Sequence, residues 1–294
     1  MHVLLKRMFN LYSNIAADPG TYRQLNVGES LITVFNCPLE NKLQDTWSHH
    51  NYIVCVIEGR KIWHTATGSY DLQPPQCVFI RKGACIIEQF FDARFCLMMF
   101  FVPDDFIVEV LKSKTNPIRQ TPGSHQAIIP ISHTPATEAF FQSMMPYFRS
   151  GHEPDRSLLE LKFKELILSI ADNPDNKELL SYFYSLMREP QQVSLQRIME
   201  ENFRFNLKLD DFAKLSCRSV SAFKRDFVKI YNISPGKWLL AKRLDHARHL
   251  LTNAGKSVGD AAFESGFESA SHFSRCFRER FGFPPADARQ KMLA

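Results

Sequence analysis

The stretch of sequence that decides the fold occurs twice. Lys208–Pro235 reads KLDDFAKLSCRSVSAFKRDFVKIYNISP, and Ser257–Pro285 reads SVGDAAFESGFESASHFSRCFRERFGFPP. Each copy is typical of a short helix, a tight turn and a second helix, which is helix-turn-helix geometry. Gly266 supplies the turn of the second copy, because glycine adopts positive φ at no steric cost. At an offset of 50 residues, the matching pairs are Ser219 and Ser269, Phe223 and Phe273, Arg225 and Arg275, Phe227 and Phe277, and Pro235 and Pro285.

The second helix of each copy is predicted to be amphipathic. The core side would hold Val220, Phe223, Phe227 and Ile230, then Ala270, Phe273, Phe277 and Phe281. The outward side would hold Ser221, Ala222, Arg225 and Lys229 with Lys224 on the flank, then Ser271, His272, Arg275, Arg278 and Glu279 with Ser274 on the flank. Small residues permit close approach to a major groove, and arginine can make two hydrogen bonds to guanine. An ordinary surface helix explains the Phe spacing equally well, but it does not explain arginine at the same outward position in both copies.

A third helix is predicted between the two copies, over Pro235–Ala254. Proline suits the first position of a helix. Leu240, Leu244, Ala247 and Leu251 would form its apolar stripe. Two groove readers on one face of DNA must lie about 34 Å apart, and one rigid helix could hold that spacing within a single chain.

Charge is distributed unevenly along the chain. The 294 residues carry 36 Lys+Arg and 31 Asp+Glu, a formal net charge of +5. Pro190–Ala294 holds 18 of the basic and 11 of the acidic residues, whereas the rest holds 18 basic and 20 acidic. A basic C-terminal third predicts a polyanionic partner such as nucleic acid, although helix faces exposed to solvent are also often basic.

The preceding part of the chain is predicted to begin with strands and continue with helices. Short β-branched and aromatic runs separated by turn signals indicate a β barrel or jelly roll. The expected strands are Leu31–Cys37, Tyr52–Ile57, Lys61–Thr67, Cys77–Arg81, Ala84–Phe91 and Phe95–Val102. The expected helices are Asp104–Lys112, Thr134–Arg149, Pro154–Asp172 and Asp175–Arg188, with a loop over Ser113–Pro130.

We therefore expect an α+β chain of two domains. Residues 1–188 would form a sensory or dimerisation domain, with a cupin-like β barrel over about 1–102 and a helical part over about 103–188. Residues 190–294 would form an all-α double helix-turn-helix domain. The helical pair of the first domain could form a dimer interface or simply pack onto its own strands.

Several classes of protein are not favoured by the composition. The longest apolar run, Phe95–Val102, is far shorter than the roughly 20 residues of a membrane span. The N-terminus MHVLLKRMF lacks the long apolar region of a signal peptide, so a cytoplasmic protein is expected. Seven Cys at irregular spacing fit reduced thiols better than a disulfide framework.

Metal, cofactor and catalytic sites are not predicted. Metal-binding cupins carry two His separated by one residue on a strand, whereas His49 and His50 are adjacent and would point to opposite faces. Among the five Cys of residues 1–188 (Cys37, Cys55, Cys77, Cys85 and Cys96), buried thiols are expected to act as small hydrophobes. Cys85, which follows Arg81 and Lys82, is the best candidate for a thiol switch. Trp47, Tyr52, Trp63 and Phe79 could line a barrel pocket or form plain core.

The C-terminal third resembles the AraC/XylS family of bacterial transcription regulators over roughly Leu195–Lys291. The matching pieces are Phe212-Ala213, Ser219-x-x-x-Phe-Lys-Arg-x-Phe, Ile233-Ser234-Pro235 with Trp238, Lys242-Arg243-Leu with Ala247 and Leu250-Leu251, Gly266-Phe267, Ser271-x-Phe-Ser-Arg-x-Phe, and Phe281-Gly-Phe-Pro-Pro. The sequence departs from the family pattern at Cys217 and Asn232, where Gly is usual, and at Lys208, where a capping Ser or Thr is common.

The resemblance implies that two recognition helices enter adjacent major grooves. By position, the base-contacting candidates are Ser221, Ala222, Lys224 and Arg225, then Ala270, Ser271, His272, Ser274 and Arg275, and the phosphate-contacting candidates are Lys229 and Arg278. The resemblance also implies an N-terminal domain for effector sensing or dimerisation, and activation by contact with RNA polymerase, with repression by occupancy left open. Val56–Gly59 through Phe79–Gly83 is similar to the family's branch that controls type III secretion, whose N-terminal domain answers to a protein partner.

Two alternatives to a regulator remain at this point. A cupin-type enzyme or small-molecule-binding protein with a basic helical tail would need a metal site, and the missing His-x-His motif argues against it. An architectural nucleic-acid protein would bind DNA regardless of sequence and would not need residues 1–188.

Overall fold

The computed structural model describes residues 8–36, 41–91, 94–119, 125–149, 153–188 and 191–288. The chain forms two compact units, Phe9–Glu189 and a second that contains Pro190–Ala294. Within the described ranges, no helix is long and apolar enough to cross a membrane.

The first unit contains two β sheets. The five-stranded sheet has the order β1 (Phe9–Asn10), β4 (Leu43–Ser48), β9 (Gly83–Gln89), β6 (Lys61–His64), β7 (Ser69–Leu72). The six-stranded sheet has the order β11 (Ile128–Ile131), β8 (Cys77–Ile80), β5 (Asn51–Glu58), β10 (Cys96–Val102), β3 (Ser30–Asn36), β2 (Gln24–Val27). Helix α1 (Leu11–Ala17) follows β1, and the β1–β4 pair is parallel whereas the other pairs are antiparallel.

The two sheets do not close into the predicted barrel. No described strand belongs to both sheets, and β7 and β11 each pair with a single neighbour. The prediction of a β-rich fold is confirmed, and of the two expected forms, a barrel or a jelly roll, the two separate sheets exclude the closed barrel. Short alternating strands suit an open sandwich and a barrel equally well, so the sequence pattern does not separate the two.

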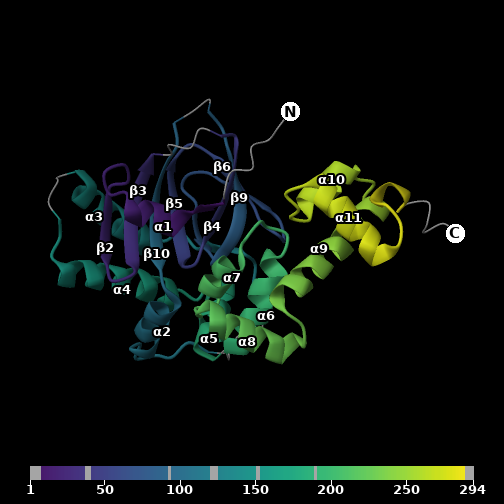
Figure 1. The fold of residues 1–294 in the computed structure, drawn as a ribbon. Coiled ribbons are helices and arrows are strands. Elements are labelled where there is room, and N and C mark those ends of the chain that lie inside the picture. Colours follow the sequence, from purple (N-terminus) through teal and green to yellow (C-terminus); the bar gives the residue numbers. More distant parts are fainter. Residues whose placement is uncertain are drawn as a thin grey trace. The chain divides into compact units, whose positions relative to one another are not determined.

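Helices cover the six-stranded sheet. They are α2 (Asp104–Lys112), α3 (Pro135–Arg149), α4 (Arg156–Asp172) and α5 (Lys177–Arg188), and Figure 1 shows α3 and α4 beside β2 and β3. Ile53 and Phe100 point into the core shared with these helices, while their neighbours Tyr52 and Phe101 point into the core between the sheets. Both faces of β5 and β10 are therefore buried, which explains why these strands read as continuous apolar runs.

A buried polar network joins the sheets to the helices. The Lys82 ammonium lies 2.5 Å from a carboxylate oxygen of Asp104. Asn51 donates to the other oxygen of Asp104, and its own carbonyl oxygen accepts from the Lys82 amide at 2.9 Å and from the Tyr182 hydroxyl at 3.1 Å. Because both charges have hydrogen-bonding partners, the cost of burying them is offset.

Several elements differ from the prediction. β11 begins inside the expected loop Ser113–Pro130, and β1, β2, β4, β7 and α1 were not predicted from the sequence. His49 and His50 occupy the turn between β4 and β5 rather than a strand. The expected Cys37 at the end of β3 lies outside the described residues.

The expectation that all the thiols are reduced is wrong for one pair. Cys55 on β5 and Cys77 on β8 form a disulfide, 22 residues apart in sequence. The antiparallel register places the two residues directly opposite each other, a proximity that the irregular Cys spacing does not reveal. Among the described residues the free cysteines are Cys85, Cys96, Cys217 and Cys276.

The second unit is helical in the part that the structure describes. Its elements are α6 (Gln191–Asn202), α7 (Leu209–Leu215), α8 (Val220–Tyr231), α9 (Pro235–Thr252), α10 (Val258–Glu264), α11 (Ala270–Phe281) and the short helix Pro285–Asp287. The predicted connecting helix is confirmed as α9, a single helix between the two repeats (Figure 1). Its buried side includes Leu239 rather than the expected Leu240, which is 36% exposed.

Candidate nucleic-acid interface

Helices α7 and α8 form the first helix-turn-helix. The Ser219 hydroxyl oxygen accepts a hydrogen bond from the Ala222 amide at 3.2 Å and so caps α8. Phe223 and Phe227 are fully buried, and the Phe227 ring meets Trp238 of α9 edge-on at 5.9 Å between centroids. The buried aromatic face fixes α8 against α9 and leaves the opposite face to solvent.

Helices α10 and α11 form the second helix-turn-helix. The Ser269 hydroxyl oxygen accepts from the His272 amide at 3.3 Å and caps α11. Phe273 and Phe277 are buried with Leu244 and Leu251 of α9. The Ser that matches between the two repeats is therefore the N-cap of both recognition helices, and α9 supplies core residues to both units.

The two turns have the same backbone geometry although their residues differ. Cys217 has φ of 53° and Gly266 has φ of 84°, both in the left-handed region. The next amide in each turn reaches back to the first helix, from Arg218 to the Ala213 carbonyl at 2.9 Å and from Phe267 to the Ala262 carbonyl at 3.0 Å. Cys217 thus adopts the glycine-like conformation that the family pattern requires.

The other two departures from the family pattern are also accommodated. Asn232 ends α8 in the left-handed conformation at φ of 57°, as asparagine can. The Asp211 carboxylate accepts from the Lys208 amide at 2.9 Å and helps to start α7 without a capping hydroxyl.

The predicted site residues lie on α8 and α11, and their side chains are exposed to different degrees. On α8, Ser221, Lys224, Arg225 and Lys229 are exposed and Ala222 is half-buried. On α11, Ala270, Ser271, His272, Arg275 and Arg278 are exposed and Ser274 is half-buried. The spacing predicted that Ala270 faces the core, whereas its position in the family pattern predicted a base contact. The structure contradicts the core position, because Ala270 is exposed at the start of α11.

Arg225 and Arg275 hold the same place in the two units. The Arg225 side chain is 77% exposed and its Nε lies 3.4 Å from a carboxylate oxygen of Asp226. An ion pair this exposed contributes little stability, so the guanidinium is available for another acceptor. Arginine donates in a fixed fork that suits guanine or phosphate, which gives each recognition helix one group able to make that contact.

Arg218 is a structural residue of the first helix-turn-helix that the pattern did not reveal. Its side chain is only 5% exposed, and its Nε donates to Asp226 at 3.1 Å. A second nitrogen donates to the Ser216 carbonyl at 2.8 Å. The guanidinium therefore ties the turn to the middle of α8, and an arginine in a turn before a cap is the only sequence signal for it.

His272 makes an internal contact that competes with base reading. Its Nε2 lies 3.3 Å from the Cys276 sulfur one helical turn later on α11. The ring would have to leave this partner before it could contact a base.

A polar junction joins the two helix-turn-helix units. Arg243 of α9 donates to the carbonyls of Phe203 and Phe205 at 2.7 and 2.8 Å, in the turn between α6 and α7. Gly266 packs against the same turn so closely that an added Cβ would lie 2.6 Å from the Arg204 carbonyl oxygen. The junction therefore holds the turn of the second helix-turn-helix against the segment that precedes the first helix-turn-helix, in addition to the covalent link through α9.

His246 completes this junction. Its Nδ1 lies 2.9 Å from the Ser265 hydroxyl and its Nε2 lies 3.5 Å from the Arg204 guanidinium. Burial, together with the positive charge of Arg204, lowers the pKa of His246 to about 4. The ring is therefore neutral at neutral pH.

Three kinds of site were considered for Phe9–Glu189: a metal site, a thiol switch at Cys85 and a pocket lined by aromatic side chains. The described residues contain no group of three or more His, Cys, Asp or Glu able to hold a metal ion. Cys85, the predicted candidate for a thiol switch, is buried, and burial raises the pKa of its thiol to about 11. The thiolate that reactivity requires is therefore suppressed. Trp47, Tyr52, Trp63 and Phe79 are all buried core.

Comparison with known proteins gives matches to both units. Residues 51–182 match the model of the ExsA N-terminal regulatory domain, and residues 212–291 match a helix-turn-helix domain. The chain is 28% identical over 242 residues to the virulence regulon transcriptional activator VirF of Yersinia enterocolitica, covering 81% of this chain and 89% of VirF. It is also 28% identical to the HTH-type transcriptional regulator ExsA of Pseudomonas aeruginosa, covering 81% and 85% of the two chains.

A solved structure of ToxT from Vibrio cholerae is similar at 11% identity and a TM-score of 0.40, covering 89% of this chain and 98% of ToxT. The helix-turn-helix match, the relatives that span most of this chain, and the repeated recognition helices all agree with the motifs found in the sequence. Residues 212–291 therefore carry an AraC-type helix-turn-helix domain, and over most of its length the chain is similar to the DNA-binding transcription regulators VirF and ExsA.

Proposed function

We propose that this protein activates transcription by binding promoter DNA with α8 and α11 in successive major grooves. The observation that carries the proposal is the equivalent, solvent-facing position of Arg225 and Arg275 in two units that share one core helix. Two such readers on one DNA face require half-sites about one helical turn apart.

Each exposed side chain receives a role from its chemistry. Arg225 and Arg275 would each donate two hydrogen bonds to a guanine, and Lys224 would assist on the flank of α8. The small side chains of the two helices (Ser221, Ala222, Ala270, Ser271 and Ser274) would let the backbone approach the base edges, and His272 would contact a base after leaving Cys276. Lys229 and Arg278 would neutralise phosphates.

The unit with the two β sheets, Phe9–Glu189, would regulate the activity of the DNA-binding unit. Its match is to a model described as a regulatory domain, and VirF is named as a transcriptional activator. We assign to it the response to a small-molecule or protein effector and a contribution to a homodimer, and we expect activation through contact with RNA polymerase. We propose no enzymatic activity for this protein.

The first experiment identifies the site and maps it. Genomic fragments retained by the full-length protein would be sequenced, and the enriched promoters would be footprinted. We expect two protected half-sites whose centres lie about 10 base pairs apart on one face of the duplex. Enrichment of no sequence over bulk DNA would contradict site-specific binding and would favour an architectural role.

The second experiment tests the sign of regulation. Transcription from an enriched promoter would be measured in vitro with purified RNA polymerase and increasing amounts of the protein. The proposal predicts more transcript for the wild type and a basal level for an Arg225→Ala, Arg275→Ala double variant. Arg156→Ala, which removes an exposed arginine of α4, should behave as the wild type. A fall in transcript as the protein is added would instead assign repression.

A further inference from the structure

Cys55 and Cys77 lie opposite each other in an antiparallel pair of strands. Their Cα atoms are 4.2 Å apart, and the β5–β8 register runs from Tyr52 opposite Ile80 to Cys55 opposite Cys77. The ladder continues with the Val56 amide donating to the Gln76 carbonyl at 3.0 Å. Backbone hydrogen bonds on both sides therefore hold the two sulfurs together whether or not they are bonded to each other.

One of the two sulfur-bearing residues is accessible. Cys77 is half-buried and lines a pocket of about 300 Å³, whereas Cys55 is 5% exposed and does not line it. Cys77 is thus the position where a small sulfur compound from solvent could meet this pair.

The pocket has two walls from different parts of the chain. Tyr70, Leu72 and Pro75 form one wall, and Ile128, Ile131 and His133 form the other. The first wall lies inside the 22-residue loop that the Cys55–Cys77 bond closes. The second wall belongs to β11 and the segment after it, and Ile131 pairs directly with Cys77.

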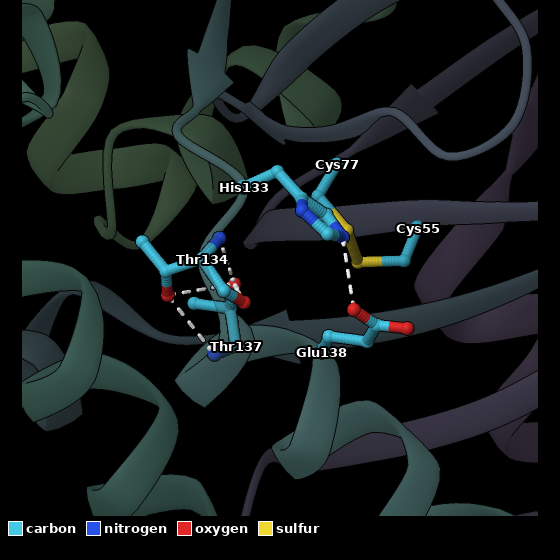
Figure 2. Close-up of a disulfide and its surroundings, with 6 residues drawn as sticks. All are labelled: Cys55, Cys77, His133, Thr134, Thr137 and Glu138. Carbon is cyan, nitrogen blue, oxygen red and sulfur yellow. Dashed lines mark hydrogen bonds and ion pairs between the residues drawn. A yellow bond between two sulfur atoms is a disulfide. The ribbon is translucent and has the colours of Figure 1, made fainter.

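His133 is held at the second wall by its neighbours, as Figure 2 shows. Its Nε2 lies 3.9 Å from a carboxylate oxygen of Glu138. Thr134 and Thr137 donate their amides to each other's hydroxyl oxygens at 2.9 and 3.1 Å, which anchors the start of α3 next to His133. The His133 ring therefore lines the same pocket as Cys77.

We propose that Cys55 and Cys77 form a reversible dithiol–disulfide site that exchanges with a low-molecular-weight thiol and its disulfide through the pocket at Cys77. The oxidised form ties the start of β8 to β5 covalently, and the reduced form leaves it held by the β5–β8 ladder alone, so that the adjoining turn at residues 73–76 opens more often. The redox state of a small thiol would in this way set the order of one wall of a pocket in the regulatory unit.

The exchange balances in two steps. The Cys77 thiol loses its proton to solvent, and the thiolate attacks one sulfur of the external disulfide, forming a mixed disulfide and releasing one small thiolate. The Cys55 thiol then loses its proton to solvent, and its thiolate attacks the Cys77 sulfur, forming the internal disulfide and releasing the second small thiolate. The protein loses two electrons and two protons, and the external disulfide becomes two thiols.

The test equilibrates the full-length protein with glutathione and glutathione disulfide over the range of ratios found in reducing and oxidising compartments. After an acid quench, free thiols are alkylated and counted by intact mass. We expect the number to fall from all seven cysteines to five as the ratio becomes oxidising, and to return when the ratio is reversed. Seven thiols at every ratio, or five at every ratio without denaturant, would each overturn the proposal.

Single variants identify the exchanging sulfur. Cys55→Ser should accumulate one glutathione on Cys77, whereas Cys77→Ser should take up at least about 10-fold less glutathione at Cys55. Cys85→Ser, a matched change of a buried thiol, should show the wild-type transition. Equal uptake by the two single variants would contradict attack through the pocket, and circular dichroism would verify that each variant is folded.

Hydrogen exchange tests the structural consequence independently. The amides of Gln73 and Gln76 should exchange at least several-fold faster in the reduced protein, while amides of β4 and β9 should be unchanged. The Cys55→Ser variant without glutathione should reproduce the reduced pattern. Identical exchange at Gln73 and Gln76 in both redox states would show that the bond does not order this turn.

Discussion

The two helix-turn-helix units reach one geometry by different means. In the first, the turn residue is the exposed Cys217, and Arg218 bonds both to Asp226 and to the chain before the turn. In the second, the turn residue is Gly266, and the next residue is the buried Phe267, whose ring lies 5.0 Å from that of Phe273. The Arg218–Asp226 ion pair holds the first turn, where there is room for the Cys217 side chain. Apolar packing of Phe267 holds the second turn, where Gly266 leaves no room for a side chain.

This difference shows that the backbone hydrogen bond of the turn is what the two repeats share. A left-handed residue is needed in both, and glycine is needed only where another backbone approaches. The units should therefore respond in opposite ways to the same exchange of glycine and a larger residue.

The largest expected effect comes from Gly266→Ala. The added Cβ would lie 2.6 Å from the Arg204 carbonyl oxygen at φ of 84°. The left-handed conformation and the overlap together should cost about 2–4 kcal/mol. Hydrogen exchange of the α10 and α11 amides measures this loss directly.

The reciprocal change in the first unit, Cys217→Gly, is the matched control. It relieves a left-handed non-glycine residue but makes the unfolded chain more flexible, so we expect a gain of less than about 1 kcal/mol in the stability of α7 and α8. Similar losses in both variants would show that the two turns do not differ as described.

A smaller effect is expected at the junction between the units. Arg243→Met removes two hydrogen bonds to the carbonyls of Phe203 and Phe205. We expect affinity for a correctly spaced site to fall by up to about 30-fold, since two bonds of about 1 kcal/mol each contribute about 2 kcal/mol. The penalty for inserting one base pair between the half-sites should shrink at the same time, because the units are less firmly coupled.

Gel-shift titrations on a series of half-site spacings measure both effects. Lys237→Met, at an exposed position of the same helix, should retain the wild-type dependence on spacing. An unchanged spacing dependence in Arg243→Met would mean that α9 alone couples the two units.

Acid should weaken the junction through His246. Its pKa is about 4 in the folded protein, against about 6.5 in an unfolded chain. The unfolded state therefore binds a proton first, so the contribution of His246 is full above pH 6.5 and is lost as the pH falls toward 4. Because the ring is only half-buried, we expect a loss of about 1–2 kcal/mol.

Urea unfolding at pH 7 and at pH 5 would detect the effect of His246. His246→Gln should lose less stability than the wild type over this interval, and contributions from other histidines cancel in the comparison. An identical pH dependence would remove His246 from the account.

The smallest effects are expected at the phosphate contacts. Lys229→Ala and Arg278→Ala should each reduce the slope of log affinity against log salt by about 0.9, because each removes one phosphate contact. The loss should be uniform across DNA sequences. A loss confined to one sequence would reassign the residue to base reading.

The sequence predicted the helical unit, Pro190–Ala294, better than the β-sheet unit, Phe9–Glu189. The repeated Ser and Phe positions determine the caps and the buried faces of α8 and α11 locally, and these were confirmed. Arg218, Arg243 and His246 were not predicted as structural residues, because their partners lie in other turns or on other helices. The same holds for Cys55 and Cys77, whose contact depends on strand register.

The choice between a closed barrel and two separate sheets was not predicted, for a related reason. Whether β7 and β11 close a barrel depends on long-range pairing, and short strands of this kind occur in both architectures. The core strands β5 and β10 were found because burial on both faces makes their whole length apolar.

A double-mutant cycle tests the central claim most directly, that α8 and α11 read separate half-sites of one DNA. Affinities of the wild type, Arg225→Ala and Arg275→Ala would be measured on the intact site and on sites with either half-site replaced. Each variant should lose about 1–3 kcal/mol on the intact site. Each should also be nearly insensitive to replacement of its own half-site while remaining sensitive to replacement of the other. Equal losses of both variants on every DNA would contradict the account, because both arginines would then contact phosphate alone.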